Sequence, residues 1–406
     1  MGRFKAILGC LVFLGLSSAA QAGETHLLWK ERPLLEEEGI SFNVISVEDF
    51  VSNVKGGQQT KSTWLGVLDM DMSVDTGKAG LWAGGQFYVR GVNVHGHKKP
   101  SGELVGDLQG VDGNESPRIS RLQELWYQHS WQEDRLTLLG GVHDMNFEFA
   151  VSENGWLYMN SGFGLTPSIA NNVAVPTYPY PALGVRVLFT LREGLSLRTG
   201  VYDGDPGDST DHPGGPDFSW NGKGGTFVVS EAAFDYRIPW GRAGLPGTCK
   251  AGFWFHSRDI DDVSSVDDNG DPVRHRNDYG AYGIIDQMLW QEAEGQGLSA
   301  FLMGGGAPED RNTVALHAAG GLNYTGLIPG RNQDRSGIAV THASISGKKR
   351  KAEDLDEAET TVEGTYRIVF NDNVAVQPDI QYVMSPSADP ALKNATVVML
   401  RMEIVY

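Results

Sequence analysis

Residues 397–406 read VVMLRMEIVY, and two kinds of side chain alternate along them. Successive side chains of a strand point to opposite faces, so an extended chain places its apolar members on one side. These apolar members are Val398, Leu400, Met402, Ile404 and Tyr406. The other side carries the charges of Arg401 and Glu403. Such a strand, apolar on one face and charged on the other, is typical of a membrane barrel with a water-filled lumen.

The same period of two recurs along most of the chain. It is clearest in residues 226–237, 362–370 and 374–382, and in the two segments that flank Arg192-Glu193-Gly194. Sixteen such segments can be counted, and most have about 9 to 14 residues, which suits tilted strands that cross a bilayer. The predicted strands are 40–53, 60–74, 80–95, 118–131, 134–146, 180–191, 194–203, 225–238, 248–259, 278–291, 296–304, 313–325, 336–347, 358–370, 373–384 and 394–406.

The predicted connections alternate in length. Long polar links follow the third, fifth, seventh, ninth and thirteenth strands, whereas the links after the fourth, sixth and fourteenth are tight. This alternation is typical of an up-and-down barrel, whereas a β-propeller or a sandwich does not require it. We therefore predict an all-β fold, a transmembrane antiparallel barrel of the outer-membrane porin type with about 16 strands, whose two ends lie in the periplasm. A water-filled lumen also explains the low mean hydropathy of −0.27.

The first residues predict export. Arg3 and Lys5 precede the apolar run AILGCLVFLGL, and small residues end at Ala22, which is the pattern of a secretory signal peptide cleaved after that residue. The alternative, a lipoprotein site at Cys10, would leave only a few apolar residues before the cysteine. We expect a signal peptide at 1–22, a periplasmic segment at 23–39 and the barrel at 40–406.

Composition argues against several classes of protein. The formal net charge is −18, and loss of Arg3 and Lys5 makes it about −20, which disfavours nucleic acid as a partner. Only Cys249 remains after the predicted cleavage, so a disulfide framework is not expected. Beyond residue 22, no stretch approaches the length of about 18 apolar residues that a spanning helix needs.

Seven stretches resemble a single family. The clearest is residues 359–406, with QPDIQY at 377–382, Pro386 and the final LRMEIVY. The others are residues 34–57, 95–116, 121–150, 178–190, 280–290 and 321–340. In this order they resemble the carbohydrate-selective porins of the OprB family. The resemblance implies a sixteen-stranded outer-membrane barrel that passes sugars by facilitated diffusion, and resemblance to outer-membrane proteins implies that the barrel assembly machinery reads Tyr406.

A sugar pore needs paired donors and acceptors for sugar hydroxyls, and aromatic faces for the pyranose ring. In RLQELWYQ, one face carries Glu124, Trp126 and Gln128, and the opposite face carries Leu125 and Tyr127, which suit lipid. On the preceding strand, the side chains predicted to point inward are Trp82, Gln86, Tyr88 and Arg90. We expect the constriction at these two strands. Further candidates for pore lining are Asp144, Arg186, Arg198, Glu231, Asp235, Asp286, Gln377, Asp379 and Arg401. The alternative for them is charge pairing across neighbouring strands.

The long segment 147–179 contains Trp156, Tyr158 and Phe163. Two outcomes are open for it, since such a loop can fold into a pore and narrow it or pack on the rim.

Two acidic stretches, 203–211 and 259–271, raise the hypothesis of a calcium site. In the second, Ser265 takes the first ligand position of an EF-hand and Arg276 replaces its bidentate glutamate. We therefore predict two solvated external loops that repel anions near the entrance. Divalent ions that bridge these loops to lipopolysaccharide are the alternative.

The predicted function is passive diffusion of neutral sugars, namely monosaccharides such as glucose, with small oligosaccharides left open. The predicted partners include outer-membrane lipid and lipopolysaccharide, and no catalytic residue, cofactor or metal is expected. The ten histidines show no H-E-x-x-H spacing, and no G-x-S-x-G occurs. The alternatives are a porin for another class of small solute, an outer-membrane barrel enzyme and a soluble sugar-binding β-protein. The sequence leaves monomer and homotrimer open.

Overall fold

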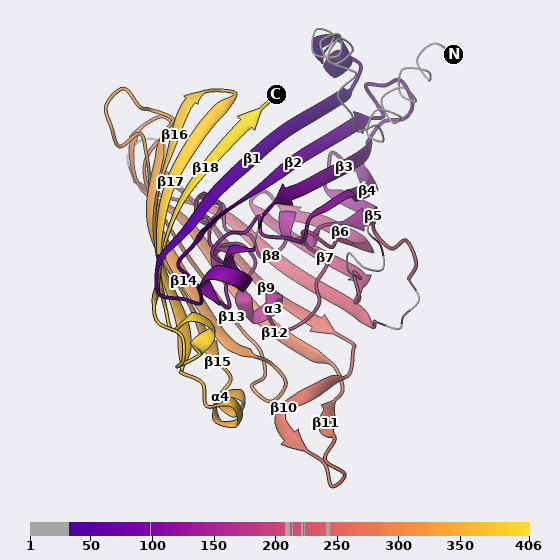
Figure 1. Ribbon diagram of the computed structural model, residues 1–406. Coiled ribbons are helices and arrows are strands. Elements are labelled where there is room, and N and C mark those ends of the chain that lie inside the picture. Colours follow the sequence, from indigo (N-terminus) through magenta and orange to yellow (C-terminus); the bar gives the residue numbers. More distant parts are fainter. Residues whose placement is uncertain are drawn as a thin grey trace.

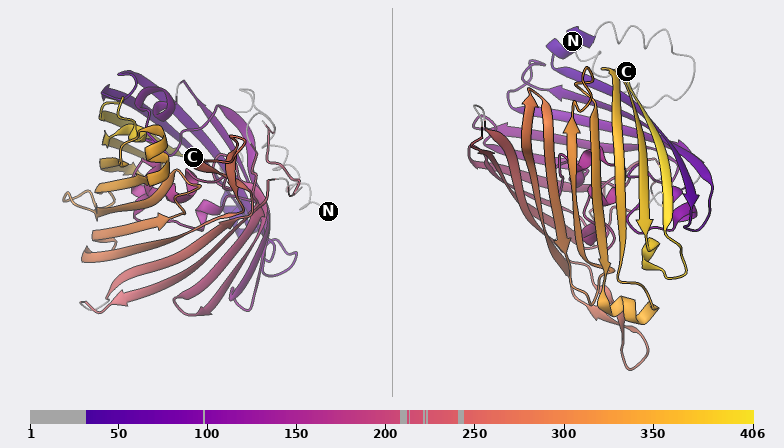
Figure 2. Two further views of the ribbon diagram at one scale, coloured as in Figure 1. Left: turned by 90° about the horizontal axis from the view of Figure 1, so that it is seen from below. Right: turned by 90° about the vertical axis from the view of Figure 1, so that its left-hand side faces the viewer.

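The computed structural model describes residues 32–97, 99–207, 212, 214–220, 222, 224–240 and 244–406. Within them, sixteen antiparallel strands close a barrel and two further strands form a separate hairpin (Figures 1 and 2). The barrel strands are β1 (Ile40–Lys55), β2 (Ser62–Asp75), β3 (Gly85–Gly96), β4 (Ile119–Trp131), β5 (Leu136–His143), β6 (Ala182–Arg192), β7 (Leu195–Asp203), β8 (Thr226–Ile238), β9 (Leu245–His256), β12 (Asp278–Ala293), β13 (Gln296–Gly306), β14 (Val314–Thr325), β15 (Arg335–Ile345), β16 (Ala358–Asn371), β17 (Val374–Met384) and β18 (Ala395–Val405). The hairpin consists of β10 (Ile260–Val266) and β11 (Pro272–His275). Among the helical segments are residues 32–37, α3 (Pro167–Ala170) and α4 (Gly347–Glu353).

The barrel closes between its first and last strands. β1 pairs with β18, which places Asp49 opposite Arg401 and Phe50 opposite Leu400. This pairing confirms the predicted all-β barrel and the predicted role of residues 397–406 as its closing strand. Closure removes the free sheet edges, so the wall can pair its backbone groups where lipid offers no partner. The predicted signal peptide lies outside the described residues.

The alternation of side chains divides the wall into a lipid face and a luminal face. On β18, Val398 and Leu400 are 42% and 45% exposed, whereas Val397 and Met399 are 0% and 2% exposed. The two exposed residues are among those that the sequence assigned to lipid. Leaving such a side chain in water costs about 1.5–3 kcal/mol relative to burial, so this outer face is stable only against hydrocarbon.

One side chain that was predicted to point inward points the other way. Trp82 lies in the turn before β3, where its indole N–H donates to the Tyr127 hydroxyl at 2.8 Å and its ring contacts Phe87. Both partners belong to the lipid face. The prediction extended the period of two through Gly84, whose φ of +83° interrupts the extended backbone and therefore the alternation.

The two ends of the barrel differ. β1 begins and β18 ends at one end (top of Figure 1), whereas the hairpin β10–β11 and helix α4 lie at the other. We call these the periplasmic end and the external end, because outer-membrane barrels carry their short turns on the periplasmic side. The long connection between β5 and β6 enters the barrel, and α3 lies inside the wall (Figure 1). None of the helices in the described ranges is long and apolar enough to span a membrane.

Candidate functional site

The connection between β5 and β6, residues 144–181, crosses the lumen and is held by inward-pointing carboxylates. Asp286 of β12 accepts hydrogen bonds from Ser152 Oγ at 2.7 Å and from the backbone N–H groups of Asn154 and Glu153 at 3.1 and 3.2 Å. Asp286 is only 6% exposed, so these bonds satisfy the loop donors and the buried carboxylate together.

Two further carboxylates hold the same loop at other points. Glu363 of β16 accepts from the backbone N–H groups of Met159 and Asn160 at 2.6 and 3.0 Å. Glu231 of β8 accepts from the backbone N–H of Ala150 at 2.9 Å. Hydrogen bonds to an ionised group are about twice as strong as neutral ones. Three strands that are far apart in the sequence therefore fix the path of the loop.

The loop also packs apolar side chains on the luminal wall. Tyr158 and Phe163 are 6% and 1% exposed, and both rings contact Phe301 of β13. The Tyr158 hydroxyl donates to Asn323 Oδ1 at 2.7 Å. Of the two outcomes left open by the sequence, the loop folds into the pore. Trp156 differs from its neighbours because it remains 55% exposed there.

A second loop, residues 99–118 between β3 and β4, also turns inward. Glu359 of β16 accepts from its backbone at Leu108 N and Gln109 N, at 2.6 and 2.9 Å. The carboxylate is fully buried, and it also accepts from the backbone N–H of Ser387 at 2.6 Å. One glutamate thus joins this loop to the connection between β17 and β18.

Arg401 of β18, two strands away from Glu359 in the wall, anchors the same loop. Its guanidinium donates to both carboxylate oxygens of Asp49, at 2.6 and 2.8 Å, and to Asp112 of the loop at 3.1 Å. Burial raises the pKa of Asp112, and the neighbouring Asp49 raises it further, whereas Arg401 opposes the shift. Arg401, which was predicted to line the lumen, therefore fixes a loop that narrows the lumen.

A row of paired side chains lines the luminal face of β3 and β4, and we call it the luminal ladder. Toward the periplasmic end, the register pairs Arg90 with Glu124, Tyr88 with Trp126, and Gln86 with Gln128. The rings of Tyr88 and Trp126 stack, with centroids 4.7 Å apart and planes at 21°. Arg90 Nη1 donates to Glu124 Oε2 at 3.4 Å, and Arg90 Nε donates to Asp69 Oδ1 at 2.9 Å. The pairing brings together six of the seven residues predicted for the constriction, namely Gln86, Tyr88, Arg90, Glu124, Trp126 and Gln128.

Two exposed rings of the loop face the ladder. Phe147 and Trp156 are 50% and 55% exposed, and their rings stack with centroids 6.2 Å apart. Arg90 Cζ lies 4.6 Å from the centroid of the Phe147 ring. We call Phe147 and Trp156 the aromatic platform. The sequence singled out Trp156 but not Phe147, whose segment HDMNFEFA has no periodicity that fixes its direction.

Asp144 and Arg186 connect the ladder to the loop. Asp144 accepts from the backbone N–H of Tyr178 at 2.7 Å, and burial raises its pKa. Arg186 of β6 donates to Gln128 Oε1 at 2.8 Å and forms an ion pair with Glu148 of the loop. Arg186 therefore orients the amide of Gln128 and engages its oxygen, so the amide N–H₂ is the group left to act as a donor.

The remaining predicted pore-lining residues bind the loops or the wall. Gln377 donates to Leu157 O at 2.7 Å, and Asp379 on the same strand is 4% exposed. Asp235 accepts from Thr248 Oγ1 on the neighbouring strand at 2.7 Å. Together with Glu231, Asp286 and Arg401, they lie on the luminal face, and their contacts favour a role in fixing the shape of the pore.

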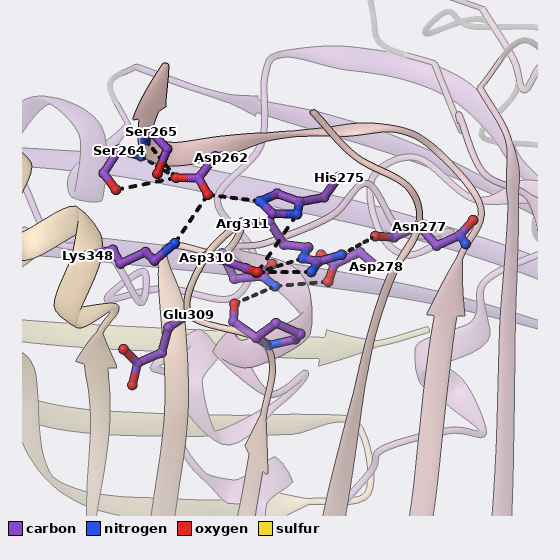
Figure 3. Close-up of polar contacts among 12 residues, drawn as sticks. Asp262, Ser264, Ser265, His275, Asn277, Asp278, Glu309, Asp310, Arg311 and Lys348 are labelled. Atoms are coloured by element: carbon purple, nitrogen blue, oxygen red, sulfur yellow. Dashed lines mark hydrogen bonds and ion pairs between the residues drawn. The ribbon is translucent and has the colours of Figure 1, made fainter. Parts of the chain in front are cut away.

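At the external end, Asp262 joins the hairpin to its neighbours (Figure 3). Its carboxylate accepts from His275 Nε2 at 2.9 Å and lies 3.3 Å from Lys348 Nζ of α4. The backbone N–H of Val263 donates to Asp310 O at 2.9 Å. The second acidic stretch therefore forms the first strand and the turn of a hairpin that is packed against two other external loops.

These contacts predict a pH dependence for the hairpin. Burial raises the pKa of Asp262, but hydrogen bonds from His275, Ser264 and Ser265 outweigh burial and hold it well below 3.8. A depressed pKa contributes stability above the unfolded-state value, and this stability is lost as pH falls through the folded-state value. We expect hydrogen–deuterium exchange at 260–275, corrected for intrinsic rates, to stay constant from about pH 8 to 5 and to rise only below about pH 4.

Asp262→Asn is the control for this prediction, because it removes the titrating group. The variant should exchange faster than the wild type at neutral pH and show a weaker rise in acid. Faster exchange of the wild-type hairpin at pH 6 than at pH 8 would contradict the assignment.

The calcium hypothesis finds no support in the part of the chain that the structure describes. No group of three or more His, Cys, Asp or Glu side chains there could hold a metal ion. In the stretch 259–271, Asp267 accepts from the backbone N–H groups of Asn269 and Asp271 at 2.8 and 3.0 Å, as in a local turn. The stretch 203–211 lies partly outside the described residues.

Comparisons with known proteins agree with this geometry. The family described as "Carbohydrate-selective porin, OprB family" matches residues 59–406. Porin B of Pseudomonas aeruginosa is 23% identical over 451 residues, which cover 98% of this chain and 97% of that protein. The high-pH structure of Pseudomonas putida OprB aligns with a TM-score of 0.84 at 19% identity, over 93% of this chain and 97% of that one. The low-pH structure aligns with a TM-score of 0.60 at 15% identity, over 96% and 100%. This chain therefore belongs to the carbohydrate-selective porins of the OprB family, β-barrel channels of the Gram-negative outer membrane through which sugars pass.

Proposed function

We propose that neutral monosaccharides such as glucose cross the constriction between the luminal ladder and the aromatic platform. The observation that supports this proposal is the pair of exposed stacked rings, Phe147 and Trp156, beside Arg90 inside a lumen. Aromatic faces contact the apolar C–H face of a pyranose. Beside the buried Arg90–Glu124 pair, the half-buried Tyr88 hydroxyl and the amides of Gln86 and Gln128 supply donors and acceptors for hydroxyl groups.

The ladder allows binding that remains weak enough for release. Successive luminal side chains of one strand are about 6.6 Å apart, so a pyranose can contact the next pair before it leaves the last one. The ion pair, the stacked rings and the two amides follow one another in register. Each exchange replaces one set of hydrogen bonds by another, and the gradient of sugar alone drives the movement.

The experiment is swelling of proteoliposomes in isotonic sugar. Replacing Trp156 by alanine should lower the initial rate in glucose about threefold or more, because the sugar loses an aromatic contact. Trp290→Ala is the matched control, since Trp290 on β12 is 45% exposed and lies outside the loop. An unchanged swelling rate in Trp156→Ala would show that the aromatic platform does not contribute to glucose passage. Equal wild-type rates for glucose and a like-sized amino acid would reduce the protein to a general porin.

We also propose that residues 1–22 are a cleaved signal peptide and that the barrel assembly machinery reads Tyr406. Tyr406 is 49% exposed at the end of the closing strand, where a receptor can reach it. The external loops would contact lipopolysaccharide, since they lie at the end opposite to the short turns.

A further inference from the structure

A cavity lies at the periplasmic end of the luminal ladder and includes its last pair, Gln86 and Gln128. Its volume is about 690 Å³, and six of its lining residues are Ser41, Ser73, Gln86, Gln128, Ser130 and Thr137. The volume falls within the range of about 300–1,000 Å³ that is usual for small-molecule sites. These six side chains are neutral and polar, and the charged side chains of Glu36, Asp75, Lys78 and Asp134 also line the cavity. We call this cavity the vestibule.

The hydroxyl groups of the vestibule form two pairs across neighbouring strands. Ser41 Oγ and Ser73 Oγ are 2.8 Å apart on β1 and β2, and Ser130 Oγ and Thr137 Oγ1 are 3.1 Å apart on β4 and β5. In each pair one hydroxyl donates to the other, so the pair still offers one free O–H and several lone pairs. Each pair therefore presents a donor and acceptors side by side.

The amides extend this pattern. Gln86 and Gln128 are opposite each other in the register, and Arg186 donates to Gln128 Oε1 at 2.8 Å. This bond leaves the amide N–H₂ of Gln128 as a donor. Adjacent hydroxyls of a pyranose each need one donor and one acceptor, and a site that supplies both can replace the water that a sugar loses.

We propose that the vestibule is a second binding site for neutral pyranose sugars, which they occupy after the constriction and before release into the periplasm. The inference rests on the proposed function, because it assumes that sugars reach the vestibule through the constriction. A sugar added on the periplasmic side meets the vestibule first, whereas a sugar added outside must cross the ladder. Binding is therefore detected more readily from the periplasmic side.

The test measures glucose-induced noise in the ion current of single channels in planar bilayers, with glucose on one side at a time. The double variant Ser73→Ala/Ser130→Ala removes one hydroxyl from each vestibule pair. We expect its apparent glucose affinity from the periplasmic side to fall about three- to tenfold. Ser62→Ala/Ser230→Ala is the matched control, since the pairs Ser52–Ser62 and Thr199–Ser230 have O–O distances of 2.9 Å but lie on the lipid face.

A second measurement reports on the site itself. In a Cys249→Ser background, glucose should slow the modification of Ser73→Cys by a thiosulfonate reagent more than that of Asp235→Cys on β8. The proposed vestibule site would be overturned by two results together. The glucose affinity of Ser73→Ala/Ser130→Ala would stay within about twofold of the wild type, and glucose would protect both cysteines equally. If Trp156→Ala still slowed glucose uptake, the proposed function would stand without a vestibule site. If Trp156→Ala left uptake unchanged, the proposed function and the vestibule site would both be overturned.

Discussion

Replacing Asp286 by alanine should widen the pore and abolish its discrimination by size. The carboxylate accepts hydrogen bonds from Ser152, Glu153 and Asn154, so its loss leaves these loop donors without a partner. Each unsatisfied buried donor costs about 1–3 kcal/mol, and the loop can recover that cost only by leaving the wall and exposing its backbone to water. Single-channel conductance should rise severalfold, and the rate of disaccharide entry into proteoliposomes, relative to that of glucose, should rise above the wild-type ratio.

Asp235→Ala is the control for this prediction. Asp235 is also a luminal carboxylate, but it accepts from Thr248 on the barrel wall and not from the loop. The single-channel conductance of Asp235→Ala should stay near the wild-type value. An Asp286→Ala channel with wild-type conductance would show that the other anchors hold the loop without this carboxylate.

Replacing Arg90 by glutamine should lower glucose flux and make the channel more cation-selective. The guanidinium neutralises Asp69 and the buried Glu124 and stacks on the Phe147 ring. Removing one partner of a buried ion pair typically costs about 3–5 kcal/mol, because the other charge stays buried and unpaired. Glucose swelling should fall about tenfold or more, since hydrogen bonds to charged groups are worth about 1.5–3 kcal/mol.

The reversal potential in a potassium chloride gradient measures the second effect. Loss of one positive charge at the constriction should shift it toward the potassium equilibrium potential. Arg274→Gln, on the external hairpin with a side chain that is 74% exposed, should leave flux and reversal potential unchanged. Equal shifts in both variants would mean that the selectivity arises at the entrance and not at the constriction.

The barrel could be predicted from the sequence because its wall obeys a local rule. A strand between lipid and water must alternate, so the direction of Leu400 or Arg401 follows from its neighbours alone. The rule failed at Trp82, because the positive φ of Gly84 interrupts the extended backbone and therefore the alternation of side chains. The hairpin β10–β11 was also missed, because its packing depends on Asp262 and on loops from other parts of the chain.

The site was predicted only as far as it lies on strands. Glu124, Trp126 and Gln128 share one face by periodicity, and the register then places them opposite Arg90, Tyr88 and Gln86. No local pattern distinguishes Tyr158, which is buried on the wall, from Trp156, which is exposed in the lumen. That difference arises from contacts with β13 and β14, and residues so distant in the chain leave no local signal.

The anchoring of the loop also sets an order of events during biogenesis. Residues 144–181 depend on Glu231, Asp286 and Glu363, which belong to strands that follow the loop in the chain. Until those strands have joined the wall, the backbone donors of the loop have only water as a partner. The wall must therefore have grown as far as β16 before the loop can make all of these hydrogen bonds. We therefore expect a molecule in which these strands have not yet joined the wall to be a wider channel than the finished one.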